Sequence, residues 1–486
     1  MNSSAITASL PLLILAITSV AVMVAIAIKR NHPATAALAF AGFALSFISL
    51  WPAYSAAPVH ITALLLVDRY ALVYMGLVLA ASCAIILLSF SYLEGRSEHK
   101  EEFYLLLTLA TLGSMVLAAS SHMASLFLGL ELLSISLYAL ISYPRIEALP
   151  LEAGIKYLVL AASSSAFLLF GLALIYVAEG TMEFGRMPEP PSDGGSGLVY
   201  LAGTILVVTG IGFKLAVVPF HLWTPDVYQG APLPVTAFVA TVSKGGVFAF
   251  LLRWLRTDGA ASQPVIVAFA IVAIASMLAG NLLALQQTNI KRLLAYSSIA
   301  HMGYFLVAVI AGGSMGSVAA TYYFSAYTVT VLGAFGSLIA LSTGTREAAT
   351  FGDVTGLFWR RPLLASTFTA MVLSLAGIPL TAGFLGKFYV LTAGASAAIW
   401  TPVLVLIVSS TIGLVYYLRI IVAMFAGADS SSTPNAAKRA FGVAPGIALG
   451  LLTAALFVLG VYPGPFWDTI NAATASLGSG GVFGQP

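Results

Sequence analysis

Charged side chains are scarce in this chain. Lys, Arg, Asp and Glu make up 8% of its 486 residues, whereas 60% of the residues are hydrophobic. Soluble domains carry about 25% charged residues, so the composition excludes an ordinary soluble protein. The formal net charge of +3 also excludes the strongly basic surface that proteins use to bind nucleic acid.

Cysteine is almost absent, since Cys83 is the only one. One cysteine excludes an internal disulfide and any cysteine-ligated metal or iron–sulfur site. Cys83 is therefore expected to be a small apolar side chain within a helix. No Gly-x-Gly-x-x-Gly motif follows a strand-like segment, so the nucleotide-binding fingerprint is missing as well. We expect this chain to bind no cofactor and no metal.

Long uncharged runs instead recur along the whole length, near the ~20 residues that a helix needs to span a bilayer. Backbone polar groups in lipid must be satisfied within the segment, so these runs predict an all-α polytopic membrane protein. The first run is interpreted as a membrane helix rather than a cleaved signal, because no basic segment precedes it. The expected spans, about fourteen, are 5–28, 35–53, 70–92, 103–121, 123–142, 152–178, 198–222, 233–256, 264–286, 292–312, 316–342, 363–392, 401–427 and 443–461.

The Lys and Arg residues between the spans are unevenly distributed. Cytoplasmic loops are enriched in these residues, so loops after odd-numbered spans are expected in the cytoplasm and both termini in the periplasm. Loops after odd-numbered spans hold thirteen cations, namely Lys29, Arg30, Arg96, Lys100, Arg145, Lys156, Lys291, Arg292, Arg346, Arg360, Arg361, Lys438 and Arg439. Loops after even-numbered spans hold four, namely Arg69, Arg186, Arg253 and Arg256.

Four further cations fall inside predicted spans: Lys214, Lys244, Lys387 and Arg419. A charge near the bilayer centre costs about 2.5–3.5 kcal/mol on insertion scales, so such side chains face the protein interior or water. Glu131 is the one acid deep in a span, and it is a candidate partner for Lys214. Lys244 and Lys387 have no acid nearby in sequence. Lysines buried without such a partner hold or release a proton near neutral pH, so the set predicts a proton path.

Structural interpretations stay open for all of these residues. Glu131 and Lys214 could form an ion pair that only fixes helix packing. Lys244 and Lys387 could instead extend to the membrane surface. Arg419 lies late in its span and is expected to reach the cytoplasmic end.

Three other residues are candidates: His301 belongs with the lysines on the proton path, and His221 and Lys156 are secondary candidates. His221 is either a proton relay or a hydrogen-bonding partner at a helix end. His301 lies between the two lysines without acid partners, so we expect it to relay protons. Lys156 begins its span at the cytoplasmic side, where it is either an anchor or a point of proton uptake.

Two spans contain helix-breaking residues at mid-depth. Pro219 follows Lys214, and Pro379 precedes Lys387. Each proline removes a backbone donor and frees carbonyls, which a membrane tolerates only where the backbone lines a cavity or is buried in protein. Paired broken helices at matching places in two halves are typical of inverted-repeat transporters, with the site at the breaks.

The broken spans are the seventh and the twelfth, so they cross the membrane in opposite directions. This order predicts two inverted five-helix repeats, spans 4–8 and 9–13, within a single membrane domain, 1–486. The expected units are 1–100 for the first three spans, 101–258 and 259–428 for the repeats, and 429–486 for the last span and the tail.

Several segments resemble one known family. They are "LFLGLELLSISLYAL", "GFKLAVVPFHLWTPDVYQGAPLPVTAFVATVSK", "NIKRLLAYSSIAHMGY" and "AGIPLTAGFLGKFYV". Together with the fourteen-span length, they are similar to the antiporter-like membrane subunit N of respiratory complex I, the proton-pumping NADH:quinone oxidoreductase. The resemblance covers essentially the whole chain.

The resemblance implies a role for each buried charge. Glu131 and Lys214 would be the pair whose association tunes the proton affinity of the lysine. Lys244 would be the central relay and Lys387 the terminal lysine on the second broken helix. The span 316–342 carries tyrosines where some family members have a lysine or histidine. The bridge between Lys244 and Lys387 is therefore expected to use His301, tyrosines and water.

The implied function is proton translocation from cytoplasm to periplasm in the bacterial plasma membrane, coupled to quinone reduction elsewhere in the complex. Other membrane-arm subunits would be its direct partners. The peripheral NADH-oxidising arm, with FMN and iron–sulfur clusters, would act on it indirectly.

Three alternatives stay open. They are an Mrp-type cation/proton antiporter subunit, the homologous subunit of a photosynthetic ferredoxin-driven complex, and a structural membrane-arm protein whose charges are vestigial. The scarcity of buried carboxylates counts against cation transport, because Na⁺ and K⁺ sites usually use them.

Overall fold

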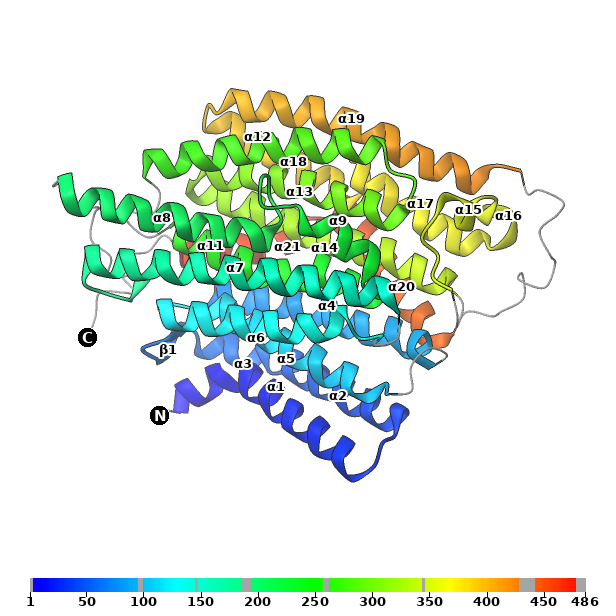
Figure 1. The fold of residues 1–486 in the computed structure, drawn as a ribbon, viewed down its shortest axis with the longest axis horizontal. Helices are drawn as coiled ribbons and strands as arrows, with labels where there is room; N and C mark the ends of the chain where they lie inside the picture. Colours follow the sequence, from blue (N-terminus) through cyan, green and yellow to red (C-terminus); the bar gives the residue numbers. More distant parts are fainter. Residues whose placement is uncertain are drawn as a thin grey trace.

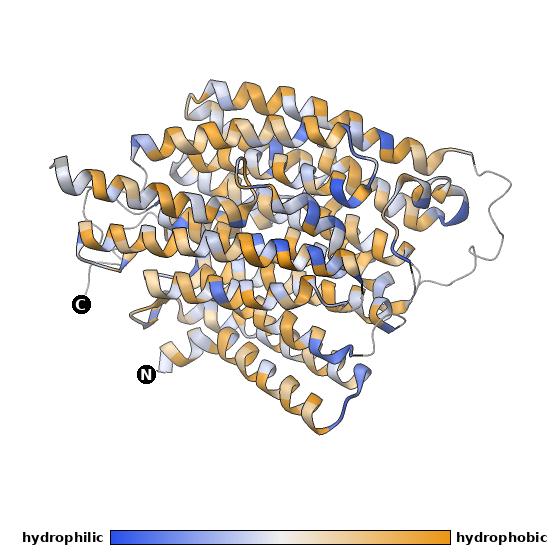
Figure 2. Cartoon of the chain, in the orientation of Figure 1, coloured by the Kyte–Doolittle hydropathy of each residue, from blue (hydrophilic) through white to orange (hydrophobic). Residues whose placement is uncertain are grey.

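The chain folds into one bundle of long helices that run side by side (Figure 1). The computed structural model describes residues 3–94, 99–144, 147–184, 194–256, 262–342, 346–427 and 442–477. Hydrophobic residues cover most of the length of the helices (Figure 2). Hydrophilic residues gather at helix ends and at several points inside the bundle. The apolar lengths between the ends suit a lipid surrounding, in which a helix satisfies the hydrogen bonds of its own backbone.

The helices of the first half precede residue 257. They are α1 (Ser3–Ile28), α2 (His32–Ile48), α3 (Leu50–Ala56), α4 (Arg69–Glu94), α5 (Glu101–Ala119), α6 (Met123–Ile141), α7 (Ala148–Glu179), α8 (Gly194–Leu215), α9 (Trp223–Gly230), α10 (Leu233–Ala240) and α11 (Val242–Trp254). A two-stranded antiparallel hairpin, β1 (Val59–Thr62) and β2 (Leu65–Val67), joins α3 to α4.

The second half begins at residue 262. Its helices are α12 (Gln263–Leu285), α13 (Ile290–Ala311), α14 (Gly313–Leu341), α15 (Phe351–Val354), α16 (Leu357–Arg360), α17 (Pro362–Ala376), α18 (Ala382–Ser396), α19 (Trp400–Phe425), α20 (Val443–Val461) and α21 (Gly464–Ala475).

The membrane spans agree with the sequence prediction. Among the described residues, thirteen helices are long and apolar enough to cross a membrane. The shorter pair α17 and α18 supplies one more span, which is interrupted. The prediction of an all-helical protein with about fourteen spans and broken seventh and twelfth helices is therefore confirmed.

Three local features differ from the prediction. The seventh span is broken over 216–222 as expected, but it does not end there and continues as α9. The eighth span, expected as one helix over 233–256, is interrupted at Thr241, whose φ and ψ of −123° and −76° are not helical. The hairpin β1–β2 was not expected at all. Hydropathy reports polarity and not backbone angles, so an apolar run does not reveal such interruptions.

Residues with positive φ end the first part of each broken span. Helix α8 stops where Ala216 takes φ 61°, and α17 stops at Gly377 with φ 87°. Gly377 suits this conformation because it has no Cβ. It also allows a close approach, since a Cβ at this position would lie 3.1 Å from Lys387 Nζ.

The two expected repeats show the same packing order. Helix α5 packs mainly against α6 and α11, which are the second and last members of its five-helix unit. Helix α12 packs mainly against α13 and α19, the second and last members of the other unit. This match supports the inverted repeats, whereas the expected boundaries at 258/259 and 428/429 lie outside the described residues.

Helices α10, α11, α13 and α14 form the centre of the bundle, since almost all their residues are buried. Helices α1, α7 and α19 lie outside and expose many apolar side chains. Such apolar outer faces suit contact with lipid.

Two cations that the sequence interpretation assigned to loops are buried instead. Lys291 is 1% exposed and Arg253 is 3% exposed. Each lies at the end of a span, and an acid from a distant segment covers it: Glu347 for Lys291 and Asp68 for Arg253. The positions Arg96, Arg145, Arg186, Lys438 and Arg439 lie outside the described residues.

Candidate functional site

A series of buried polar side chains crosses the bundle from α6 to α19. Lys214, Lys244 and Lys387 are 6%, 0% and 7% exposed, and His301 is 2% exposed. None of the three lysines extends to the surface, so the structure does not support the membrane-surface interpretation for Lys244 and Lys387.

Lys214 lies in the last turn of α8, just before the break. Its ammonium donates a hydrogen bond of 2.6 Å to Ser134 Oγ on α6 and lies 5.6 Å from the centre of the Tyr157 ring. Glu131 lies one turn before Ser134 on the same face of α6, and it accepts a 2.5 Å hydrogen bond from Ser165 on α7. Lys214 and Glu131 form no direct ion pair here, although both lie in described segments.

Lys244 lies in the first turn of α11, directly after the interruption at Thr241. Its ammonium donates a 2.7 Å hydrogen bond to Ser298 Oγ on α13. The same hydroxyl lies 2.6 Å from Tyr327 OH on α14 and 3.3 Å from Tyr228 OH on α9. Ser298 therefore joins Lys244 to two phenols from two further helices.

His301 follows Ser298 by one turn of α13 and has a phenol on each ring nitrogen. Tyr323 OH lies 2.7 Å from Nδ1, and Tyr417 OH lies 3.1 Å from Nε2. Tyr417 also forms a hydrogen bond with Ser297. A neutral imidazole donates from one nitrogen and accepts at the other, so this arrangement suits proton transfer through the ring.

Lys387 lies on α18, the second part of the broken twelfth span. Its ammonium donates to Leu375 O at 2.8 Å, to Ala376 O at 3.0 Å and to Ser410 Oγ at 2.8 Å. The two carbonyls belong to the last turn of α17, where a helix leaves its acceptors unsatisfied. The break therefore supplies the acceptors that hold the buried ammonium.

A second polar group fills the space between His301 and Lys387. The Tyr304 ring lies 5.3 Å from the His301 ring and 5.4 Å from Lys387 Nζ. Asn281 donates a 2.9 Å hydrogen bond to Tyr304 OH and accepts one of 2.9 Å from Tyr416 OH. Tyrosines therefore lie on both sides of His301.

Lys156 belongs to a separate network at the cation-rich end of the bundle, the end that carries residues 29–31, 99–100 and 346–361. Its half-exposed ammonium lies 2.8 Å from Asp226 and 2.7 Å from Glu152. Asp226, on α9, also accepts a 2.6 Å hydrogen bond from Arg292 on α13. The structure thus gives Lys156 the contacts of an anchor.

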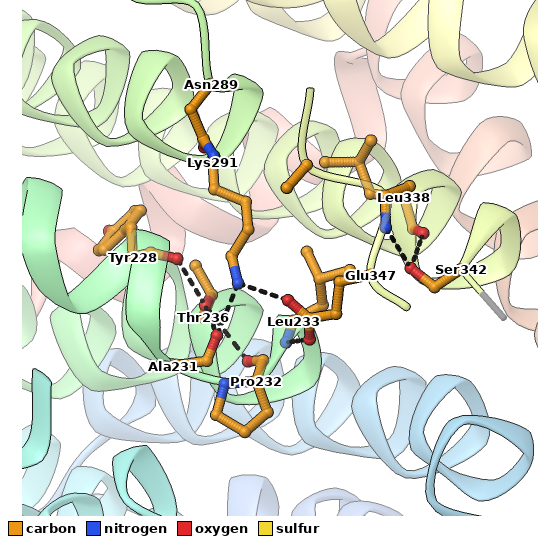
Figure 3. Close-up of polar contacts among 12 residues, drawn as sticks. Tyr228, Ala231, Pro232, Leu233, Thr236, Asn289, Lys291, Leu338, Ser342 and Glu347 are labelled. Carbon is orange, nitrogen blue, oxygen red and sulfur yellow. Dashed lines mark hydrogen bonds and ion pairs between the residues drawn. The ribbon is translucent and has the colours of Figure 1, made fainter. Parts of the chain in front are cut away.

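An ion pair between a buried lysine and a partly exposed glutamate lies beside this network (Figure 3). Lys291 extends from the start of α13 and donates to Ala231 O and to Glu347 Oε2, at 2.7 Å each. Glu347 Oε1 accepts from the backbone N–H of Leu233 at 2.9 Å and from Tyr92 OH.

His221 and Arg419 lie at helix ends. His221 is half-buried in the α8–α9 break, and its Nδ1 is buried without a hydrogen-bond partner among the described residues. Its carbonyl accepts from Thr224 N at 2.9 Å. Arg419 donates to Leu285 O at 2.5 Å, at the end of α12, so it caps that helix.

Sequence reasoning missed most of the residues that contact the buried charges and the phenols between them. A serine every few residues along an apolar helix is common, and only the tertiary contacts reveal which hydroxyl faces a lysine. The missed residues are Asp68, Ser134, Ser165, Asn281, Ser297, Ser298, Glu347 and Ser410, together with the individual tyrosines 228, 304, 323, 327, 416 and 417.

No metal site is evident in the described part of the chain. Within it, no group of three or more His, Cys, Asp or Glu side chains is arranged to hold a metal ion. Cys83 is a partly buried free cysteine on α4.

Comparisons with known proteins agree with this architecture. The family model "NADH:quinone oxidoreductase/Mrp antiporter, TM" matches residues 120–413. The curated "NADH-quinone oxidoreductase subunit N" of Ectopseudomonas mendocina (strain ymp) is 47% identical over 479 residues, which is 97% of each chain. A chain of respiratory complex I from Thermus thermophilus with bound aureothin has 33% identity and a TM-score of 0.81, over 95% of this chain and 100% of that one.

One further solved structure shares the fold alone. A chain of the Mrp complex from Dietzia sp. DQ12-45-1b has a TM-score of 0.87 over 99% of this chain and 98% of that chain. Its sequence identity is only 20%.

Proposed function

This chain belongs to the subunit N family of NADH:quinone oxidoreductase, the antiporter-like membrane subunits of complex I, and from that membership we propose that its buried lysines carry protons across the membrane. It is a multi-pass membrane subunit of a bacterial respiratory complex. Quinone reduction takes place in other subunits. The energy that it releases reaches this chain through conformational change or through electrostatic interactions between subunits.

One observation carries the proposal: the three buried lysines are hydrogen-bonded to hydroxyls or freed carbonyls rather than paired with acids. Lys214 has Ser134, Lys244 has Ser298, and Lys387 has Ser410 with two carbonyls of α17. No ion pair involves any of these lysines within the described segments. A hydroxyl both donates and accepts, so it passes a proton that a fixed ion pair would retain.

The first step is assigned to Glu131 and Lys214. Glu131 is bonded to Ser165 in this structure, one helical turn from the hydroxyl that holds Lys214. A carboxylate that approaches Lys214 stabilises the ammonium, and one that withdraws weakens its hold on the proton. Exchange of Glu131 between Ser165 and Lys214 would therefore load and unload the lysine.

The later steps follow the hydroxyl contacts. A proton that reaches Lys244 is passed to Ser298 and Tyr327, and His301 links Tyr323 to Tyr417. Water would complete the connection from this group to Lys387. The second half of the path thus depends on phenols and one imidazole rather than on carboxylates.

Orientation and partners follow from the same proposal. The cation-rich end would face the cytoplasm and both termini the periplasm, so that protons leave towards the periplasm. Other membrane-arm subunits would contact the apolar outer helices. FMN and iron–sulfur clusters would be held by the partner subunits that oxidise NADH.

Proton pumping by the whole complex tests the proposal. The complex with Lys214→Ala, reconstituted in vesicles, is expected to pump several-fold fewer protons per NADH oxidised than the wild type. An Arg346→Ala variant is the control, because the Arg346 side chain forms an exposed pair with Asp353 and, among the described residues, no contact with the buried lysines. Unchanged pumping by Lys214→Ala at normal quinone reduction would favour a purely structural subunit. Sodium movement in place of protons would favour an antiporter.

A further inference from the structure

Helix α9 is held by two consecutive cations of α13. Arg292 donates to Asp226 at 2.6 Å and to Gln229 at 3.1 Å, both on α9. Lys291 donates to Ala231 O, directly after the last residue of α9, at 2.7 Å. Asp226, Lys291, Arg292 and Glu347 are called the α9 clasp below. The clasp joins the first half of the bundle to the second.

Glu347 closes the clasp from a third direction. It lies in the segment 346–350, which pairs with the start of α13 through the bridge Asn289↔Thr350 and the bond from Ile290 N to Ala349 O. From there its carboxylate binds both Lys291 and the N–H of Leu233, the first residue of α10 (Figure 3). One carboxylate therefore fixes α13 and the α9–α10 turn to the same loop.

The segment that the clasp holds reaches the central lysine. Tyr228 lies on α9 between the clasp residue Asp226 and Ala231. Its hydroxyl lies 3.3 Å from Ser298 Oγ, and its ring centre lies 5.9 Å from Lys244 Nζ. The 3.3 Å contact is longer than the 2.5–3.0 Å that is usual between hydroxyls, so a small movement of α9 would break it.

We propose that the α9 clasp positions Tyr228 against Ser298 and Lys244, and so controls proton transfer at the central lysine. The proposal rests on the proposed function, since it assumes that Lys244 carries protons. Glu347 and Lys291 are positioning residues in this account. They act through α9 and touch neither Lys244 nor Ser298.

The arrangement favours control over simple support. A carboxylate that only neutralised Lys291 would not need the N–H of Leu233, which belongs to the turn leading from α9 to α10. Thr236 on α10 adds contacts to the same turn, with its hydroxyl 3.2 Å from Tyr228 O and 3.3 Å from Ala231 O. Loss of the Glu347 charge would weaken the hold on this turn at Lys291 and at the N–H of Leu233, and so loosen the end of α9 that leads into it.

The experiment uses the whole complex with Glu347→Gln in this chain, and Arg346→Ala as the control in the same loop. Deuterium uptake by the backbone amides of residues 223–233 measures how firmly the clasp holds α9. The number of protons pumped per NADH oxidised measures how the clasp affects proton transfer. Glu347→Gln is expected to raise deuterium uptake and to lower pumping about fivefold, the lower end of typical coupling between sites, while Arg346→Ala changes neither.

A double variant separates positioning from general damage. If the clasp acts through Tyr228, Tyr228→Phe with Glu347→Gln is expected to pump no worse than the more affected single variant. Multiplied losses would overturn the proposal, and so would raised deuterium uptake with normal pumping. If the complex with Glu347→Gln fails to assemble, Arg292→Gln, which breaks the more exposed side of the clasp, is tested in its place. The same results would support or overturn the proposal.

A Lys244→Ala variant in the same assay keeps the two proposals apart. Loss of pumping in Lys244→Ala but not in Glu347→Gln would overturn the clasp and leave the proposed function standing. Normal pumping in Lys244→Ala would overturn the proposed function. It would also overturn the proposed control by the clasp, which assumes that Lys244 carries protons.

Discussion

At the scale of single residues, hydroxyl groups hold the buried charges. Serines from three helices accept from the three central lysines, and phenols extend these contacts. An ammonium in a low-dielectric interior needs such acceptors, because an unsatisfied buried charge is far more costly than a satisfied one. The sequence placed the lysines correctly within spans, but it could not say which serine faces which lysine.

Ser298 should be the most sensitive of these hydroxyls. Ser298→Ala removes the acceptor of Lys244 and the contacts of Tyr327 and Tyr228. Leaving a buried donor without an acceptor costs about 1–3 kcal/mol of stability. Proton pumping by the complex is expected to fall several-fold. Ser325→Ala is a matched control, since within the described segments the hydroxyl of the buried Ser325 bonds to Thr321 O of its own helix alone. Equal losses in both variants would argue against a specific role.

At the scale of elements, broken helices and helix ends do the positioning. The break in the twelfth span gives Lys387 two carbonyls, and the break in the eighth sets Lys244 at the start of α11. Prolines in the sequence revealed the seventh and twelfth breaks. The interruption at Thr241 has no proline, and α9 is too short and polar to register as a span, so both escaped prediction.

The start of α4 is tied to the end of α11 by a buried ion pair. Asp68 receives two hydrogen bonds from Arg253, at 2.8 and 2.9 Å, and also accepts from Ala71 N. Asp68→Ala would leave Arg253 buried without its partner, so we expect a loss of stability of about 3–5 kcal/mol. Thermal unfolding of the purified complex measures it.

An exposed pair provides the comparison for Asp68. Glu102→Gln breaks the contact with the half-exposed Arg30 and is expected to cost far less stability, because solvent screens the exposed pair. Equal shifts in the unfolding midpoint for the two variants would contradict the argument from burial.

The α9 clasp should respond to acid. Burial disfavours the ionised Glu347 carboxylate, but the Lys291 charge and the donated hydrogen bonds outweigh it and lower the pKa of Glu347. Because the folded-state pKa is the lower one, this stabilisation is complete above the unfolded-state pKa and is lost as the pH falls through the folded-state value. The unfolding midpoints of wild type and Glu347→Gln should differ at pH 7 and converge below about pH 4.3. If the two unfolding midpoints converged as the pH was raised instead, the lowered pKa of Glu347 would be contradicted.

At the scale of the whole molecule, composition and span order predicted the fold. Runs of about 20 apolar residues can only be membrane helices, and the order of the two breaks indicated the repeats. Burial at span ends was not predictable, because Lys291 and Arg253 look like ordinary loop cations until distant acids are seen to cover them. The resemblance to subunit N supplied the roles, and the structure supplied the hydroxyl contacts.

The most direct test of the central claim is the number of protons pumped per NADH oxidised by the reconstituted complex with Lys244→Ala. The proposed path through Lys244 predicts a clearly lower ratio than in wild type, with the complex fully assembled. A ratio equal to that of the wild type would contradict the claim that protons cross the membrane through this chain.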